Sequence, residues 1–248
     1  MEKWEQDLAE LTPRAVVLRE WLDPLPVRGT RAKGPLMLEE AGQPKAGKTC
    51  QKKLVHQFFR RAPVSMQVNA LPEGPEELLG YREEPRYTYQ KLLYSLKQVF
   101  EGPLSTYYHL DVLDRGPVDA AAWFYCHEGH GVISAEERDV VTAFVLSPRI
   151  LSDLDGCVIV ICDPKVSLAR EASVALSAKP GRYMNEEMLG RLNRAYRTVY
   201  GLVKDRVPTL LLDTTDEGPK ESTVRVIRHI VECGERRMAR EKLDPSGS

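Results

Sequence analysis

Short apolar runs recur along the chain and predict the strands of a sheet. Five of them cover residues 35–38, 64–70, 107–114, 157–162 and 208–213. The run at 157–162 is apolar throughout, which is typical of a central parallel strand that is covered on both faces. The run at 64–70 alternates between apolar and polar residues, as a half-buried strand does.

Between these runs the apolar residues recur at the spacing of a helix. The predicted helices cover residues 3–24, 50–59, 87–100, 134–145, 147–153, 186–203 and 222–235. Pro13 is expected to divide the first of them. Ser134 is a suitable N-cap for the helix at 134–145, and Gly234 is expected to cap the last helix.

Strands that alternate with helices predict an α/β fold, a doubly wound, mostly parallel five-stranded sheet with right-handed crossovers. We expect this domain to span residues 35–235. Residues 1–34 are an N-terminal helical appendage, a leader and linker, which packs on the domain or, as the alternative, docks a partner. Residues 236–248 are charged and then rich in Pro, Gly and Ser, and we expect them to form a flexible tail.

The overall composition argues against two classes of partner. The chain has 248 residues, a formal net charge of −1 and an apolar fraction of 42%. This charge creates no field that would attract nucleic acid or an anionic membrane. No apolar run approaches the roughly 20 residues that span a bilayer. The five cysteines are scattered and odd in number, which favours a reduced setting, so we expect a cytoplasmic protein.

Residues 42–49, GQPKAGKT, fit the phosphate-binding pattern G-x-x-x-x-G-K-S/T. They follow a predicted strand and precede a predicted helix, which is the context in which this pattern binds a nucleotide. Backbone N–H groups of the loop then surround the phosphates. Lys48 would reach the β- and γ-phosphates, and the hydroxyl of Thr49 would hold Mg²⁺. The alternative is an ordinary turn that contains glycine.

Together with this loop, three further segments resemble the small P-loop nucleoside and nucleotide kinases, a family that includes thymidylate kinases and deoxynucleoside kinases. Residues 113–120, LDRGPVDA, are similar to the Asp-Arg element that ends the third strand in that family. Residues 163–171 are similar to the segment that leads from the fourth strand into the lid, and residues 180–185 to the segment that precedes the next helix. The resemblance covers residues 35–233.

The resemblance implies the strand order 2-3-1-4-5 and an ATP-dependent phosphotransferase that uses Mg²⁺. Asp114 would hold the metal together with Thr49, Arg115 would hold the acceptor or the γ-phosphate, and Arg170 would act from the lid. The residues implied to bind ATP are Gly42, Pro44, Ala46, Gly47, Lys48, Thr49, Cys50, Arg182 and Thr215, the last in a segment that would frame the adenine. The alternatives are a surface ion pair at Asp114 and Arg115, a solvated loop around Arg170, and a plain polar turn at Thr215.

The acceptor is left open by the sequence, with a nucleoside or nucleotide as the first choice. The family has an acidic residue at the end of the second strand, where this chain has Asn69, so the general base is either Asp114 or Glu73. Trp123 and Phe124 either orient an acceptor base or belong to the core, and residues 127–130 are expected to form a surface turn. The alternative function is a regulatory NTPase or nucleotide-binding switch, and a homodimer is possible.

Overall fold

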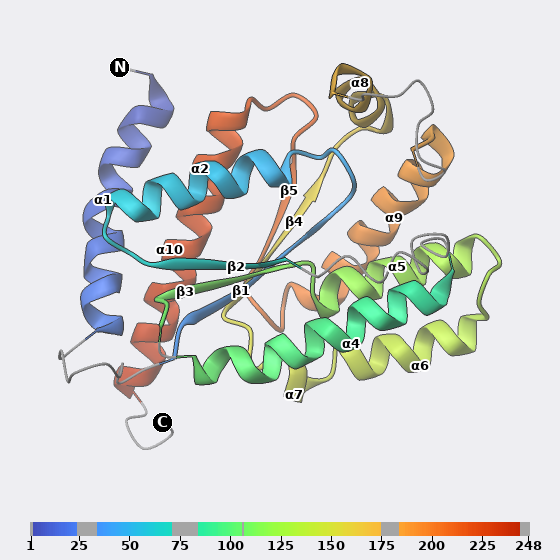
Figure 1. Ribbon diagram of the computed structural model, residues 1–248, viewed down its shortest axis with the longest axis horizontal. Coiled ribbons are helices and arrows are strands. Elements are labelled where there is room, and N and C mark those ends of the chain that lie inside the picture. The colour runs from blue at the N-terminus through green and yellow to red at the C-terminus, as the bar shows by residue number, and fades with distance from the viewer. Residues whose placement is uncertain (1, 24–33, 71–83, 106, 175–183, 244–248) are drawn as a thin grey trace.

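In the computed structural model, which describes residues 2–23, 34–70, 84–105, 107–174 and 184–243, five parallel strands form one sheet in the order β2-β3-β1-β4-β5 (Figure 1). The strands are β1 (Leu36–Gly42), β2 (Met66–Ala70), β3 (Leu110–Asp114), β4 (Gly156–Ile161) and β5 (Thr209–Asp213). The predicted fold class and strand order are confirmed. β1 lies between β3 and β4, so the strand order reverses its direction at β1. Ligands of α/β sheets bind at such a reversal, at the carboxyl ends of the strands.

Helices cover both faces of the sheet (Figure 1). One face packs against α1 (Lys3–Leu22), α2 (Lys48–Arg61) and α10 (Pro219–Leu243). The other face packs against α4 (Pro85–Glu101), α5 (Pro117–Gly129), α6 (Ala135–Val145), α7 (Pro148–Leu151) and α9 (Glu186–Val203). A short 3₁₀ turn, η1 (Gly102–Leu104), follows α4, and α8 (Pro164–Val174) follows β4. The described part of the chain contains no helix long and apolar enough to cross a membrane.

The register brings the ends of the central strands to one edge. Glu40 pairs with Asp114, and Gly42 pairs with Val160. β1 is longer than its predicted run at 35–38 because Glu39 and Glu40 continue it as buried strand residues, with exposed fractions of 0% and 4%. Two adjacent glutamates normally indicate a surface segment, and only their tertiary partners explain this burial.

The N-terminal helix differs from its prediction in one respect, since Pro13 lies inside α1 and does not divide it. Leu11, Ala15 and Leu18 of α1 are buried in the same apolar cluster as α2, α10 and the sheet. This packing compensates for the hydrogen bond that proline removes from the helix. Of the two alternatives for this segment, the structure shows packing on the domain.

The last helix also differs from its prediction. Gly234 does not cap α10, which continues to Leu243 and so includes the first part of the predicted tail. A Cβ atom on Gly234 would lie 2.5 Å from the Leu18 side chain. The glycine therefore permits the close approach of α1 and α10 and has no role in ending the helix.

α5 was missed by the sequence interpretation, and the predicted surface turn at 127–130 is wrong for residues 127–129, which belong to α5. His127 lies in the last turn of α5 and is 3% exposed, with Nε2 2.8 Å from the Thr88 hydroxyl. Nine of the thirteen residues of α5 are buried, so its sequence lacks the polar stripe that marks a surface helix. Phe124 is a core residue and Trp123 packs against the core, which agrees with the second of their two interpretations.

Candidate active site

The phosphate-binding pattern forms the turn between β1 and α2 at the carboxyl edge of the sheet. Its backbone has positive φ at Gly42 (143°), Lys45 (58°) and Gly47 (108°). A Cβ atom on Gly42 would lie 2.1 Å from the carbonyl oxygen of Val160, so this position requires glycine, whereas a Cβ on Gly47 would meet no heavy atom within 4 Å. Turns that alternate into the left-handed region form concavities of N–H groups that bind anions, and the N-terminus of α2 adds its positive end. The position beside Gly47 is open, so no described side chain covers the loop there.

Lys48 lies against the inside of this loop. Its Nζ donates hydrogen bonds to the carbonyl oxygens of Gly42 (2.7 Å) and Gln43 (2.8 Å), and the residue is 8% exposed. Burial and then the nearby Arg115 guanidinium lower the pKa of the Lys48 ammonium to about 8. Within the described ranges, the contacts of this ammonium are with two neutral carbonyls, and a phosphate oxygen would offer it a stronger, charge-assisted hydrogen bond.

The backbone just after β4 and a side chain of α8 hold the loop from one side. The Gln43 amide donates to the carbonyl oxygen of Cys162 (2.7 Å) and to the Ser167 hydroxyl (2.9 Å). The Ser167 hydroxyl in turn lies 3.0 Å from the carbonyl oxygen of Pro44, to which it donates. These bonds fix the part of the loop that has no regular secondary structure.

Arg170 is brought to the same loop by α8. Its guanidinium donates to the carbonyl oxygen of Lys45 (3.3 Å) and to the carbonyl oxygen of Thr214 (2.8 Å). The Thr214 hydroxyl donates to the carbonyl oxygen of Ala46 (2.7 Å), which ties the end of β5 to the loop. Thr215 lies one residue further and donates its hydroxyl to Asp213 (2.6 Å). The sequence interpretation included Arg170 and Thr215 and missed Thr214, whose only signal was its position after a predicted strand.

Asp119, which the sequence interpretation did not select, connects three parts of the site. Its Oδ1 accepts the N–H of Gly42 (3.1 Å) and the hydroxyl of Tyr196 (2.7 Å), and its Oδ2 lies 3.0 Å from Nη1 of Arg115. Asp119 is 3% exposed, and Arg115 itself has a positive φ of 76°. The carboxylate therefore links the start of the phosphate loop to β3, α5 and α9.

Glu39 holds the N-terminus of α5 in place. Its carboxylate accepts the backbone N–H groups of Val118 (3.0 Å) and Asp119 (2.7 Å), and burial raises the pKa of Glu39 to about 8. A Cβ atom on Gly116 would lie 2.6 Å from the Glu39 carboxyl carbon, so the glycine makes room for this contact. The helix-capping role explains why a glutamate is buried inside β1.

The two residues predicted to hold the metal differ in their surroundings. Thr49 is exposed in the first turn of α2, and Asp114 ends β3 with a quarter of its side chain exposed. The Asp114 carboxylate forms an ion pair with Lys52, whose Nζ also lies 3.6 Å from Glu40. A carboxylate and a hydroxyl are oxygen ligands of the kind that Mg²⁺ takes. Among the described residues, no group of three or more His, Cys, Asp or Glu side chains is placed to hold a metal ion.

Asn69, at the end of β2, is also engaged. Its amide donates to Oδ1 of Asp111 (2.7 Å) and accepts from the Gln67 amide. Asp111 is 2% exposed, and burial raises its pKa to about 6. The other residue considered as a general base, Glu73, and the predicted ATP ligand Arg182 lie outside the described residues.

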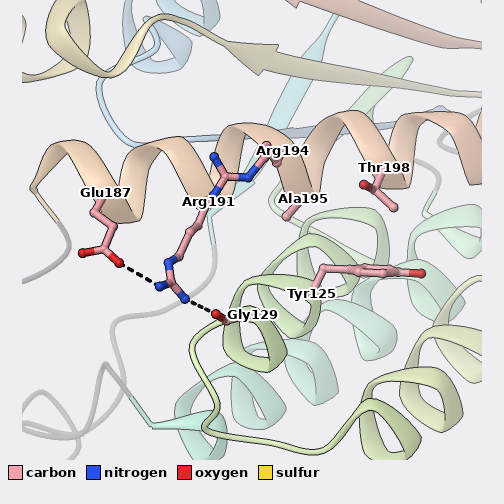
Figure 2. A pocket seen from close by; sticks show the side chains of 7 residues that line it. All are labelled: Tyr125, Gly129, Glu187, Arg191, Arg194, Ala195 and Thr198. Atoms are coloured by element: carbon pink, nitrogen blue, oxygen red, sulfur yellow. Dashed lines mark hydrogen bonds and ion pairs between the residues drawn. The ribbon is translucent and has the colours of Figure 1, made fainter.

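A separate pocket of about 420 Å³ lies between α5 and α9 (Figure 2). Arg191 crosses its mouth, where its guanidinium bonds to Glu187 (2.7 Å) and to the carbonyl oxygen of Gly129. The lining residues are Tyr125, Gly129, Glu187, Arg191, Arg194, Ala195 and Thr198. None of the predicted site residues is among them, so this hollow is distinct from the phosphate-binding loop.

The sheet order together with the loop after β1 defines the fold of the P-loop kinases, and comparison with solved structures agrees. The chain is similar to deoxyadenosine kinase from M. mycoides with bound dATP, with a TM-score of 0.55, 14% identity and coverage of 79% of this chain and 99% of that one. It is similar to thymidylate kinase from Candida albicans, with a TM-score of 0.53, 11% identity and coverage of 82% and 94%.

A third similar structure is a putative polyphosphate kinase 2 from Pseudomonas aeruginosa, with a TM-score of 0.64 and 17% identity. That match covers 98% of this chain but 47% of the other one. No family model matches the sequence, and no curated protein does. At these identities the likeness establishes the fold, and the chemistry has to be argued from the site.

Proposed function

We propose that the chain is a phosphotransferase of the small P-loop kinase type, which uses ATP with Mg²⁺ and transfers the γ-phosphate to a nucleoside, a nucleotide or a related small acceptor. The observation that carries the proposal is the loop at 42–49, with open space beside Gly47 and the Lys48 ammonium lying on its inner side. The guanidinium of Arg170 contacts the same loop. The three named structural neighbours, all kinases, support this reading.

Each of these groups has a physical task in phosphoryl transfer, which depends mainly on placement and charge neutralisation. The loop N–H groups bind the phosphates, and Lys48 exchanges its two carbonyl partners for phosphate oxygens. Thr49 and Asp114 would hold the metal, which would supply positive charge to neutralise the phosphates. Arg115, oriented by Asp119, holds the acceptor or the transferring group with its planar fork of donors.

Arg170 supplies positive charge from α8, and Arg182 and Thr215 complete the ATP contacts. The base that accepts a proton from the acceptor is Asp114 or Glu73. Asp114→Asn and Glu73→Gln should differ in their pH–rate profiles, because only the loss of the true base removes the acidic limb. The cytoplasmic location and the possible homodimer stay predictions.

A nucleotide-binding switch or regulatory NTPase is the second candidate. The observation in its favour is Asn69, because the end of β2 carries an amide that is already bonded to Asp111 where the family places an acid. The packed leader helix α1 would then be the surface that reports the nucleotide state.

ATP consumption with and without an acceptor panel separates the two candidates. The panel contains nucleosides, nucleotides and, because one structural neighbour carries that name, polyphosphate. Turnover that requires one acceptor supports the kinase, and acceptor-independent turnover supports the switch. Lys48→Ala should abolish either activity, whereas Lys53→Ala, an exposed lysine on the same helix, should not. Arg115→Ala should reduce acceptor-dependent transfer more than ATP binding. Full activity in Lys48→Ala would refute both candidates.

A further inference from the structure

Lys52 lies close to two carboxylates at the carboxyl edge of the sheet, next to the phosphate loop. Lys52 follows Lys48 by one helical turn on α2, and its ammonium pairs with the carboxylate of Asp114. The same Nζ lies 3.6 Å from Oε2 of Glu40. Glu40 and Asp114 are register partners on β1 and β3, so the sheet itself sets their separation.

This cluster is shielded from water. Glu40 is 4% exposed, and the side chains of Lys52 and Asp114 are 14% and 25% exposed. Oε2 of Glu40 has no hydrogen-bond partner among the described residues. Two neighbouring carboxylates in such a place require a cation, because their mutual repulsion and the loss of hydration both oppose ionisation.

The position of this ammonium has a consequence for the metal. A divalent cation and an ammonium compete for the same carboxylate oxygens, and Asp114 is also the residue proposed above to hold Mg²⁺. Lys52 extends from the helix that begins at the loop, so its charge stays close to the phosphates whether or not a metal is present. The ammonium is therefore an intramolecular cation at the place where the metal is expected.

We propose that Lys52 is a positioning residue that competes with the divalent metal for Asp114, so that the metal engages this carboxylate only by displacing the lysine. This inference rests on the proposed function for its biological meaning, although the competition itself can be measured without nucleotide. The site should bind divalent cations weakly when Lys52 is present. ATP affinity should then depend less on the metal than in a variant without the lysine.

The experiment measures Mn²⁺ binding to the nucleotide-free full chain by the loss of the free-ion EPR signal. Lys52→Met keeps an unbranched side chain that is one atom shorter and removes its charge, and Lys53→Met on the exposed neighbouring position is the matched control. Lys52→Met should bind Mn²⁺ about tenfold more tightly than the wild type, from the loss of one pairwise charge interaction near the protein surface. Adding Asp114→Asn to Lys52→Met should reverse the gain, and Lys53→Met should match the wild type.

A second measurement is calorimetric titration with ATP in Mg²⁺ and in EDTA. The ratio of the ATP affinity in Mg²⁺ to the ATP affinity in EDTA should be about tenfold larger in Lys52→Met than in the wild type. If Lys52→Met does not fold, the double variant Glu40→Gln/Lys52→Met removes one charge of each sign and leaves Asp114 free, and the same gain is expected. Equal Mn²⁺ affinity in the wild type and the folded variant would overturn the inference. Absence of ATP binding under every condition would instead refute the proposed function.

Discussion

Replacing Asp119 by asparagine isolates one of the three contacts that this residue makes. Oδ1 accepts the N–H of Gly42 and the hydroxyl of Tyr196, and an asparagine carbonyl oxygen in the same place retains both. Oδ2 lies 3.0 Å from Nη1 of Arg115. In asparagine an NH₂ group takes the place of Oδ2, so two hydrogen-bond donors would face each other. The substitution therefore removes the charge of the pair and its shorter bond to Arg115. It leaves the bonds of Oδ1 to Gly42 and Tyr196 and the longer contact of Oδ1 with Nη1 of Arg115 (3.3 Å).

The expected cost follows from the burial of the two partners. The side chain of Asp119 is 4% exposed and that of Arg115 is 30% exposed, so the pair is intermediate between a surface and an interior ion pair. Exposed pairs are worth about 0–1 kcal/mol, and breaking a fully buried pair costs about 3–5 kcal/mol. We expect Asp119→Asn to lower the free energy of unfolding by about 2 kcal/mol, which for a chain of this size corresponds to a fall in Tm of about 4–8 °C.

Thermal unfolding followed by circular dichroism measures this change. Asp139→Asn, on α6, is the matched control, because its side chain is 65% exposed and pairs with the adjacent Arg138. Tyr196→Phe removes a bond that Asp119→Asn retains. Because the two side chains are in direct contact, the double variant should depart from the sum of the two single effects by about 0.5–3 kcal/mol. If Asp119→Asn and Asp139→Asn melt within about 1 °C of the wild type, the carboxylate is not a structural link, and the reasoning is wrong.

Three further outcomes are expected. Cys50 is the exposed one of the five cysteines, so a thiol reagent should modify one thiol in the native protein and five in denaturant, and bound ATP should slow the native reaction. Gly42→Ala should lower the free energy of unfolding by at least about 3 kcal/mol, because its Cβ would clash with the backbone, whereas Gly131→Ala (φ 72°, open space) should cost about 1 kcal/mol in urea denaturation. Burial lowers the pKa of His127 to about 4, so the unfolded chain binds more protons between pH 6.5 and 4 and stability falls over that range. Denaturation of the wild type and of His127→Gln at each pH measures this effect. Between pH 6.5 and 4 the free energy of unfolding of His127→Gln should fall by about 2–3 kcal/mol less than that of the wild type. If the two free energies of unfolding change equally with pH, the pKa assigned to His127 is wrong.

Local sequence patterns were sufficient to predict the fold class of this protein. Strand runs separated by helical spacing predicted the parallel sheet, and residues 186–203 were predicted with the bounds that α9 has. The turn at 42–49 was located because its pattern places glycine at two positions, Gly42 and Gly47, where the backbone adopts positive φ. Such signals have causes within a few residues of the chain, so sequence is enough to identify them.

The same reasoning failed where a residue's role depends on a distant partner. Nothing near Glu39 in the sequence indicates that it caps α5, which begins almost eighty residues later. Gly234 looks like a helix cap until α1 is seen to approach it. α5 lacks a polar stripe because it is enclosed by other helices and the sheet, and its burial became evident only in the assembled fold.

The sequence by itself determined the α/β class, the position of the phosphate loop and the polar residues at the strand ends. Tertiary structure decided which of those polar residues meet. Parallel pairing in register places Glu40 beside Asp114, and the packing of α2 on the sheet then sets Lys52 between them. Pairing and packing join segments far apart in the chain, so the contacts around the loop have no local signal, although the loop does.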